Sequence, residues 1–355
     1  MLHGGEIYGP IDVRHDFSVN INPLGIPEQV YRRLEENRGA LMQYPDRKCA
    51  ALRRALSVFT GVPEEQILCG NGASELIEAS IRTIRPQKVL VTAPSFSGYA
   101  RAVKNSGAEL VYHELKREDG FALTARFLQD LEKLGDSVRL NLVILCSPSN
   151  PVGNRIAPEL LTEIAERCAR LGIWLMVDEC FLCFTENETE WTMRRYLTGT
   201  GFGIADRLLV LDAFTKRFAM PGVRLGYLMA KDPPFLSKVA AQQPEWSVSA
   251  TAQTAGTAAL ENADEYLRTA RRMIASERLK METALCQMGC TVFPGEANYI
   301  FFSSEKPLFE LLLEKGILIR DCSNYPGLKK GDYRVAVKTP GENRILIKAV
   351  EEIMG

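Results

Sequence analysis

The sequence predicts an α/β protein in which a mostly parallel β-sheet lies between helices and a smaller α+β domain completes the chain. Three observations lead to this fold class. Apolar, β-branched segments of strand length recur along the chain, an amphipathic helix separates two of them, and 355 residues exceed one typical core. Strands that are apolar along their whole length are typical of a sheet covered by helices on both faces.

The expected strands of the sheet are the apolar runs at 88–93, 109–115, 140–146, 173–179, 208–214 and 224–230. Residues 157–172 are expected to form a helix, because Pro158 stands near the start, Gly172 stands at the end, and apolar side chains recur along one face. Ligands of such sheets bind beyond the carboxyl ends of the strands. The polar residues that follow each strand are therefore the first candidates for a site.

Three parts of the chain are expected. Residues 1–42 form an N-terminal arm and part of the smaller domain, 43–245 form a large domain, and 246–355 form a small C-terminal domain. In this last part we expect a long helix over 265–289 and short strands at 298–302 and 333–337.

Composition favours a small-molecule ligand. Lys and Arg number 43 against 44 Asp and Glu, and no basic run suggests a nucleic-acid or membrane surface. No apolar run approaches the ~18 residues of a membrane helix. The first 18 residues do not resemble a signal peptide, so a cytoplasmic protein is expected.

The cysteines and histidines do not predict a metal site. Nine cysteines lie mostly in apolar segments, and Cys180 and Cys183 form a single C-x-x-C. The three histidines, His3, His15 and His113, are scattered, so no second ligand pair completes the motif. A structural role for both cysteines is the expectation.

Polar residues at four strand ends suggest one site. "GNGASE" at 70–75 is a glycine-rich turn before a helix and could bind an anion, although Glu75 stands where a dinucleotide fingerprint has its third glycine. Asn150 and Asp178 follow two further strands, and Thr215, Lys216 and Arg224 follow or begin others. Taken singly, each could be an ordinary turn or surface residue.

Together these residues match the chemistry of one cofactor. A lysine desolvated among cations has a lowered pKa, which frees its amine to attack an aldehyde. Pyridoxal 5′-phosphate (PLP) carries an aldehyde, a ring nitrogen that a carboxylate can keep protonated, and a phosphate. The residues at these strand ends supply a partner for each of the three groups.

The same motifs, in this order and spacing, resemble the fold-type I superfamily of PLP enzymes. They are "GNGASE", "SPSNPVG", "VDE" and "TKRFAMPGVRLGY", and the resemblance covers nearly the whole chain. It implies the aspartate-aminotransferase-like fold. Two families within the superfamily look closest, the L-threonine-O-3-phosphate decarboxylases of cobalamin biosynthesis and the histidinol-phosphate aminotransferases. The decarboxylases are favoured by "HGG" at 3–5, "DFSVNINPLG" at 16–25, "QYPD" at 43–46 and "LIRDCSNYPGL" at 318–328.

The resemblance implies a role for each candidate residue. Lys216 would bind the cofactor and move protons at the substrate α-carbon, and Asp178 would pair with the ring nitrogen. The other cofactor contacts would come from Gly72, Ala73, Ser74, Phe96, Asn150, Phe181, Thr215 and Arg224, with Tyr44 reaching the phosphate of a neighbouring subunit in a homodimer. The substrate contacts would come from Arg334, Asn150, Asn22, His3, Arg320 and Asn324, with Arg334 holding the carboxylate.

Three positions depart from the pattern of aminotransferases. Phe181 stands where they commonly have a tyrosine, and Ala213 stands where a serine or threonine usually contacts the cofactor phosphate. Lys338 stands where they tend to have glycine, and its charge beside Arg334 would suit a dianionic substrate. Phe181 and Lys338 favour the decarboxylase reading.

The expected activity is therefore PLP-dependent decarboxylation of an O-phosphorylated amino acid, L-threonine O-3-phosphate or L-serine O-phosphate, to an amino alcohol phosphate for cobamide biosynthesis. A histidinol-phosphate-type aminotransferase that uses glutamate and 2-oxoglutarate is the alternative. A non-catalytic PLP-binding regulator would be expected to carry a DNA-binding extension. A nicotinamide-dependent oxidoreductase is disfavoured by Glu75 and by the central lysine.

Overall fold

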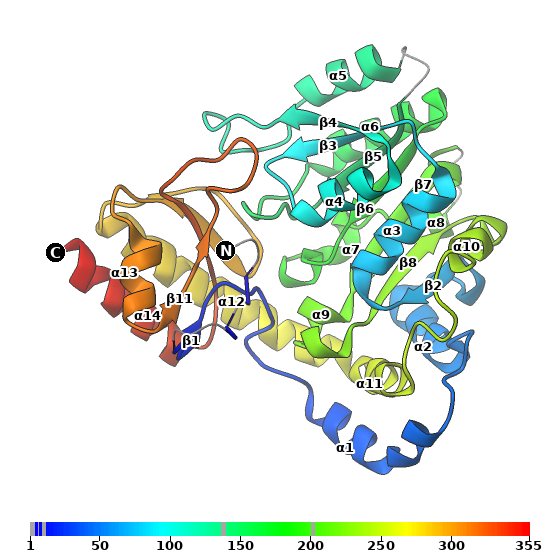
Figure 1. The fold of residues 1–355 in the computed structure, drawn as a ribbon, viewed down its shortest axis with the longest axis horizontal. Coiled ribbons are helices and arrows are strands. Elements are labelled where there is room, and N and C mark those ends of the chain that lie inside the picture. The colour runs from blue at the N-terminus through cyan, green and yellow to red at the C-terminus, as the bar shows by residue number, and fades with distance from the viewer. Residues whose placement is uncertain (1–3, 6, 9–11, 136–139, 200–202) are drawn as a thin grey trace.

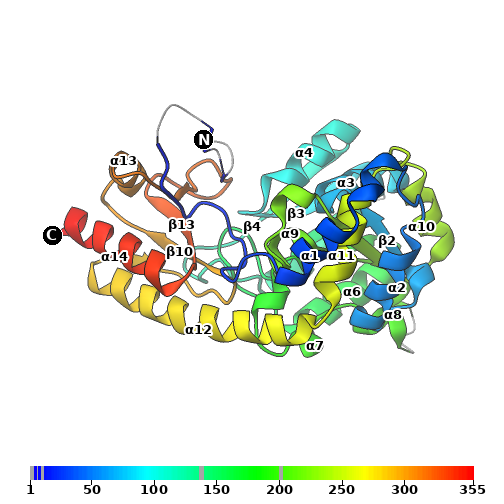
Figure 2. The ribbon, with the colours of Figure 1, turned by 90° about the horizontal axis from the view of Figure 1, so that it is seen from below.

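The computed structural model describes the whole chain except residues 1–3, 6, 9–11, 136–139 and 200–202. Two lobes are visible, a larger one built on a seven-stranded sheet and a smaller one that holds the C-terminus (Figure 1). The long helix α12 (Ala263–Gln287) runs along both lobes (Figure 2). Among the helices of the described residues, none combines the length and the apolar character needed to cross a membrane.

The seven-stranded sheet has the strand order β2-β8-β7-β6-β5-β3-β4. All its strands run in one direction except β8, which is antiparallel to both of its neighbours. The predicted α/β class is therefore confirmed. The strands are β2 (Ile67–Gly70), β3 (Lys88–Ala93), β4 (Glu109–Glu114), β5 (Leu140–Cys146), β6 (Trp174–Asp178), β7 (Leu208–Ala213) and β8 (Gly226–Ala230).

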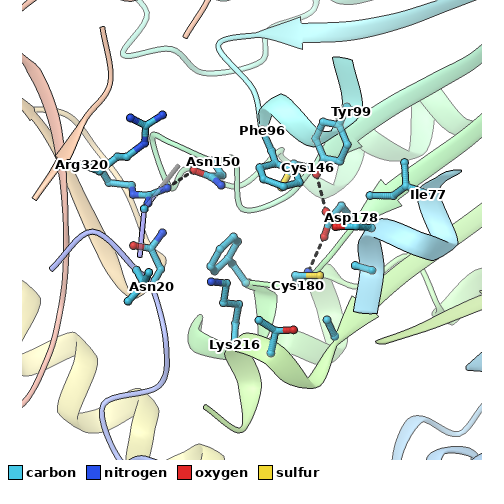
Figure 3. Close-up of a pocket in the computed structure, with 18 of the residues that line it drawn as sticks. Asn20, Ile77, Phe96, Tyr99, Cys146, Asn150, Asp178, Cys180, Lys216 and Arg320 are labelled. Carbon is cyan, nitrogen blue, oxygen red and sulfur yellow. Dashed lines mark hydrogen bonds between the residues drawn. The ribbon is translucent and has the colours of Figure 1, made fainter. Parts of the chain in front are cut away.

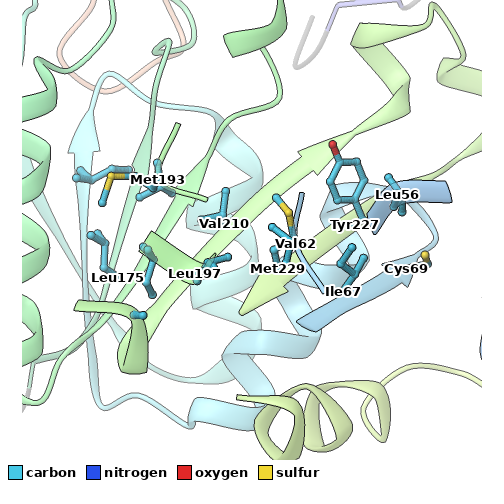
Figure 4. Packing of buried hydrophobic residues seen from close by; sticks show 14 of the residues in the cluster. Leu56, Val62, Ile67, Cys69, Leu175, Met193, Leu197, Val210, Tyr227 and Met229 are labelled. Carbon is cyan, nitrogen blue, oxygen red and sulfur yellow. The ribbon is translucent and has the colours of Figure 1, made fainter. Parts of the chain in front are cut away.

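Helices cover both faces of this sheet because its strands are apolar on both sides. On β6, for example, Leu175 and Val177 belong to one hydrophobic cluster and Met176 belongs to another on the opposite face. Figure 4 shows part of the first cluster, where Leu175 and Val210 of the sheet pack with Met193 and Leu197. Helices on the first face are α2 (Ala50–Thr60), α5 (Arg126–Gly135) and α6 (Pro158–Leu171), and those on the second are α3 (Gly72–Ile84), α4 (Ser97–Ser106) and α10 (Pro233–Ala240).

The smaller lobe is built on a four-stranded antiparallel sheet with the order β12-β13-β10-β9. Its strands and helices are β9 (Thr291–Val292), β10 (Tyr299–Ser303), β12 (Arg320–Asp321), β13 (Asp332–Ala336), α13 (Leu308–Glu314) and α14 (Pro340–Met354). The start of α14 carries a capping box, in which Thr339 and Glu342 exchange hydrogen bonds. The N-terminal strand β1 (His15–Asp16) joins this lobe by parallel pairing with β11 (Ile317–Leu318).

Two helices pack on the larger lobe although they lie outside residues 43–245. Val30 of α1 (Glu28–Glu36) and Ala255 of α11 (Ala250–Leu260) belong to the same hydrophobic cluster as the central sheet. Figure 2 shows these two helices side by side on that lobe. The small side chains of α11 allow this close packing. The division of the chain at 42/43 and 245/246 stays a prediction.

The remaining helices are short. They are α7 (Glu188–Trp191), α8 (Arg195–Thr198), α9 (Phe214–Arg217) and the 3-10 turns η1 (Arg38–Met42), η2 (Glu64–Gln66), η3 (Leu182–Phe184), η4 (Ile204–Arg207) and η5 (Pro221–Val223). Helix α9 begins directly after β7, and α3 begins two residues after β2. The carboxyl ends of parallel strands meet at one edge of the sheet, so these helices and the loops after β5 and β6 converge there.

Candidate active site

A cavity of about 260 Å³ lies at the carboxyl ends of the strands, between the two lobes. The structure brings most of the predicted site residues together around it (Figure 3). The predicted residues that line it are Ala73, Ser74, Phe96, Asn150, Asp178, Phe181, Thr215, Lys216, Arg224, Arg320 and Arg334.

Lys216 lies in α9, immediately after the central strand β7. Burial, with the nearby positive charges of Arg334 and Arg224, lowers the pKa of its amine to about 8. About one molecule in ten then carries the neutral, nucleophilic amine at pH 7. The backbone N–H of Asn22 donates to the Lys216 carbonyl at 3.2 Å, which ties this turn to the N-terminal arm.

Asp178 is the last residue of β6, and both of its carboxylate oxygens accept a hydrogen bond. The Tyr99 hydroxyl donates to Oδ2 at 2.6 Å, and the backbone N–H of Cys180 donates to Oδ1 at 3.0 Å (Figure 3). The Tyr99 ring lies edge-on against Phe96, with the ring centres 5.4 Å apart. Hydrogen bonds of this kind offset the cost of burying a carboxylate.

The N-terminus of α3 forms a concave, electropositive surface. Ala73 and Ser74 line the cavity here, opposite Thr215 and Arg224. Gly72 has a φ of +77°, and a Cβ at this position would lie 2.6 Å from Nη2 of Arg224. A glycine is therefore required for the guanidinium to approach the helix N-terminus, and the free backbone N–H groups and the cation together fit a phosphate.

Glu75 has a structural role that its place in the motif did not reveal. Its Oε2 accepts hydrogen bonds from the Asn71 backbone at 2.8 Å, from Gln243 at 2.7 Å and from Ser247 at 2.6 Å. These contacts fix the glycine-rich turn to the segment before α11.

Two arginines face each other on neighbouring strands of the smaller lobe. Arg320 of β12 is paired in register with Arg334 of β13, and both side chains are buried against the cavity. Arg334 donates to Asn150 Oδ1 at 2.5 Å and to the Ser18 carbonyl at 2.7 Å. Like charges that face each other across a sheet destabilise it unless anions lie between them. The pair therefore suits a ligand with two anionic groups.

Of the predicted residues that the structure describes, Gly72, Tyr44, Asn22 and Asn324 do not line the cavity. Tyr44 is 80% exposed and its ring packs against Trp246 with centres 4.6 Å apart. The Asn22 amide donates to the Arg217 carbonyl at 2.9 Å, so it supports the lysine turn instead. Asn324 accepts a hydrogen bond from Arg320 at 2.7 Å, and His3 lies outside the described residues.

Two of the three positions that depart from the aminotransferase pattern line the cavity, and the third does not. Phe181 lines the cavity and lies edge-on against Tyr299, with centres 5.0 Å apart, while Ala213 lines it beside the anion cradle. Lys338 does not line the cavity. Its ammonium donates to Glu342 of α14 at 2.8 Å, so the expected charge beside the substrate is paired with this carboxylate instead.

The cysteines of the C-x-x-C have separate surroundings. Cys180 lines the cavity, whereas Cys183 packs in the hydrophobic cluster of the smaller lobe. Burial raises the pKa of both thiols, which keeps them protonated.

Several residues at the cavity were missed by the sequence analysis. They are Gly4, Ser18, Val19, Asn20, Ile77, Tyr99, Cys146 and Tyr325. The amide oxygen of Asn20, in the orientation that satisfies both of its polar groups, accepts from Nη1 of Arg334 at 3.2 Å and from Nε at 3.3 Å. A strand pattern in "SVNIN" would put Asn20 and Asn22 on the same face, and the segment is irregular, so no local signal separates the two.

The chemical groups of the cavity fit PLP. A buried amine of lowered pKa, a carboxylate held by neutral donors, an aromatic ring and an anion cradle line the same space. These groups match the aldehyde, ring nitrogen, ring face and phosphate of the cofactor.

Comparison with known proteins identifies the family. Residues 15–350 match the model of "Aminotransferase class I and II". The chain is 37% identical to a threonine-phosphate decarboxylase from Salmonella typhimurium, over 96% of this chain and 91% of that protein. It is 33% identical to a histidinol-phosphate aminotransferase from Desulfitobacterium hafniense, over 94% of this chain and 90% of that protein.

Solved structures agree with this result. The crystal structure of the histidinol-phosphate aminotransferase from Clostridium acetobutylicum superposes with a TM-score of 0.87 at 28% identity, covering 96% of this chain and 99% of that one. An aspartate aminotransferase from Thermus thermophilus has the same fold, with a TM-score of 0.80. The aspartate-aminotransferase-like fold and the enzymatic nature of the chain are thus confirmed. The chain belongs to the class I and II aminotransferase family, and its cofactor is PLP.

Proposed function

We propose that this protein is a PLP-dependent lyase that decarboxylates an O-phosphorylated amino acid. The substrate is L-threonine O-3-phosphate or L-serine O-phosphate, and the product is an amino alcohol phosphate for cobamide biosynthesis. The observation that carries the proposal is the 37% identity to a threonine-phosphate decarboxylase over nearly the full length of both chains. A relative with 30% identity over 95% of this chain, named as an adenosylcobalamin biosynthesis protein, supports the pathway.

The cofactor would be held by residues from both ends of the cavity. Lys216 binds its aldehyde carbon, Asp178 pairs with its ring nitrogen, and Phe96 packs on its ring. Asn150 and Phe181 would contact its 3-oxygen, and Gly72, Ala73, Ser74, Thr215 and Arg224 would hold its phosphate. When bound, PLP supplies an electron sink for the bond that breaks at the substrate α-carbon.

The substrate would be held by the facing arginines. Arg334 binds the carboxylate as a bidentate partner, with Asn150 and Asn20 fixing the plane of its guanidinium. Arg320, supported by Asn324, binds the substrate phosphate. His3 remains a prediction for the same phosphate. Asn22 contributes indirectly, through the turn that carries Lys216.

The choice of reaction depends on the direction in which Arg334 holds the carboxylate. Arg334 would set the orientation of the substrate carboxylate, and PLP would supply the electron sink for its loss as carbon dioxide. Lys216, whose neutral and protonated amine are both populated near pH 8, then returns a proton to the α-carbon. The proposed phenylalanine contact at 181, in place of a tyrosine hydroxyl, is consistent with this outcome.

A histidinol-phosphate-type aminotransferase is the second candidate, because such an enzyme from Clostridium acetobutylicum superposes over almost the whole chain. The purified protein is incubated with phosphothreonine, phosphoserine or histidinol phosphate, with and without 2-oxoglutarate. Carbon dioxide release without 2-oxoglutarate supports the decarboxylase. Turnover of histidinol phosphate only with 2-oxoglutarate supports the aminotransferase, and cofactor binding without any turnover supports a regulator.

We further propose a homodimer. Three large apolar side chains are exposed close together in sequence, since Leu41 is 72% exposed, Met42 is 92% exposed and Tyr44 is 80% exposed, and Trp246 packs against the last of them. A patch of this kind is typical of a protein interface. Tyr44 would reach the cofactor phosphate of the partner. A monomer in light scattering, or a Tyr44→Phe variant with unchanged cofactor affinity, would contradict this.

The cytoplasm is the proposed location. All nine cysteines are free, and eight of them are buried, which fits a reducing compartment.

A further inference from the structure

Tyr99 lines the cavity, but none of the cofactor or substrate contacts proposed above includes it. It lies on α4, it is 1% exposed, and its hydroxyl donates to Asp178 Oδ2 at 2.6 Å (Figure 3). The same ring packs edge-on against Phe96 at an interplanar angle of 87°. One side chain therefore contacts both the carboxylate and the aromatic ring that are expected to hold the cofactor.

We propose that Tyr99 is a positioning residue for the cofactor ring, which orients the Asp178 carboxylate through its hydroxyl and fixes the plane of Phe96 through its ring. This inference rests on the binding of PLP in this cavity. Asp178 accepts its two hydrogen bonds from neutral donors, the Tyr99 hydroxyl and the Cys180 backbone N–H. The Tyr99 hydroxyl is thus the only one of the two that a side-chain substitution can remove.

The surroundings keep Tyr99 in the form that donates. Burial and the adjacent Asp178 raise its pKa well above the ordinary value, so the hydroxyl remains protonated at neutral pH. Burial likewise raises the pKa of the Cys146 thiol beside it. A neutral donor on a buried carboxylate favours the charged form without adding a competing charge.

Loss of the hydroxyl has a defined consequence. The proton between Asp178 and the ring nitrogen is shared between two bases, and an Asp178 oxygen without a donor attracts it more strongly. A hydrogen bond to a charged group contributes enough to change such an equilibrium by about tenfold or more. The ring nitrogen of bound PLP should then be less protonated, and the cofactor should bind more weakly.

The test compares two substitutions of the same kind. Tyr99→Phe removes the hydroxyl that contacts Asp178. Tyr227→Phe removes a hydroxyl that donates to Asp212 at 2.9 Å, also between fully buried partners, but away from the cavity. Both variants lose a tyrosine–carboxylate hydrogen bond, so a general loss of stability affects both.

The apoprotein of each variant is reconstituted with PLP labelled with ¹⁵N in the ring. The nitrogen chemical shift reports ring protonation, and equilibrium dialysis gives the dissociation constant. We expect wild type and Tyr227→Phe to show a protonated ring nitrogen. Tyr99→Phe should move the shift towards the unprotonated value and weaken cofactor binding by about tenfold or more. A Tyr99→Phe shift and affinity equal to those of wild type would overturn the inference.

Two further measurements keep the result decisive. Tyr99→Met, which also lacks a donor, replaces Tyr99→Phe if that variant does not fold. Tyr99→His restores a ring N–H donor and should recover part of the wild-type shift, whereas a merely structural role predicts no recovery. Wild-type protein that fails to bind PLP at all contradicts the cofactor assignment itself, and this outcome differs from one in which only the tyrosine has no effect.

Discussion

Replacement of Arg217 by methionine should destabilise the fold strongly. Arg217 follows the cofactor lysine and is 1% exposed. Its guanidinium donates to Asp212 at 2.5 Å and to Glu188 at 2.9 Å, and it lies over the Phe59 ring. Methionine fills a similar space but leaves both buried carboxylates without this cation. Removal of one partner from a buried ion pair costs about 3–5 kcal/mol of unfolding free energy.

The pKa of Glu188 reports the stabilisation that this carboxylate gains from all of its arginine partners together. Burial alone would raise it, but the charges of Arg217, Arg194 and Arg271 outweigh burial and lower it from 4.5 to about 2. A shift of this size corresponds to about 3 kcal/mol. Because the pKa is lower in the folded protein, this stabilisation is present above pH 4.5 and is lost as the pH falls towards 2.

Urea unfolding of the apoprotein, followed by circular dichroism, measures the effect. We expect Arg217→Met to lose about 3 kcal/mol or more at pH 7, and the deficit to shrink as the pH falls from 4.5 towards 2, because wild type loses the Glu188 stabilisation in that range. Arg38→Met is the control, because Arg38 pairs with Glu35 on the surface and should change stability by less than about 1 kcal/mol. A loss below about 1 kcal/mol for Arg217→Met, or a deficit independent of pH, would refute the reasoning.

Three more predictions concern the cavity. The rate at which the apoprotein reacts with PLP should rise with pH and level off above about 8, because the neutral amine of Lys216 forms in that range; a midpoint near that of free lysine would contradict the burial effect. Gly72→Ala should weaken cofactor binding by about tenfold or more, because the new Cβ meets Arg224. Gly107→Ala is the control, because Gly107 has a similar φ (+79° against +77° at Gly72) but no atom lies within 4 Å of the new Cβ. This variant should bind the cofactor as wild type does. Arg334→Lys should raise the KM for the phosphorylated amino acid by about tenfold or more through loss of the bidentate contact, and an unchanged KM would place the carboxylate elsewhere.

The catalytic centre could be predicted from the sequence because parallel strands converge at their carboxyl ends. Asp178 ends β6 and Lys216 follows β7, and these strands are neighbours in the sheet. Their positions at strand ends therefore predict, from the sequence alone, that the two side chains lie in one cavity. The glycine-rich turn at the start of α3 was recognisable for a similar reason, since backbone conformation and helix polarity are local properties.

Residues that meet through the packing of distant segments could not be predicted in this way. Tyr99 contacts an aspartate 79 positions away, and nothing in the sequence of α4 distinguishes it from an ordinary buried tyrosine. Asn20 and Asn22 are two residues apart in an irregular arm, and only the tertiary structure directs one to Arg334 and the other to the lysine turn. Lys338 likewise pairs with Glu342 of the helix that follows it and does not line the cavity.

The sequence by itself determined the fold class, the family motifs and the main catalytic groups, because hydrophobic periodicity and the residues after each strand are properties of short segments. Tertiary structure decided the reversed direction of β8, the packing of α1 and α11 on the larger lobe, and the pairing of Arg320 with Arg334. Those features depend on which surfaces bury each other and on which charges are brought together. Contacts of this kind join residues far apart in the chain, so no local pattern specifies them.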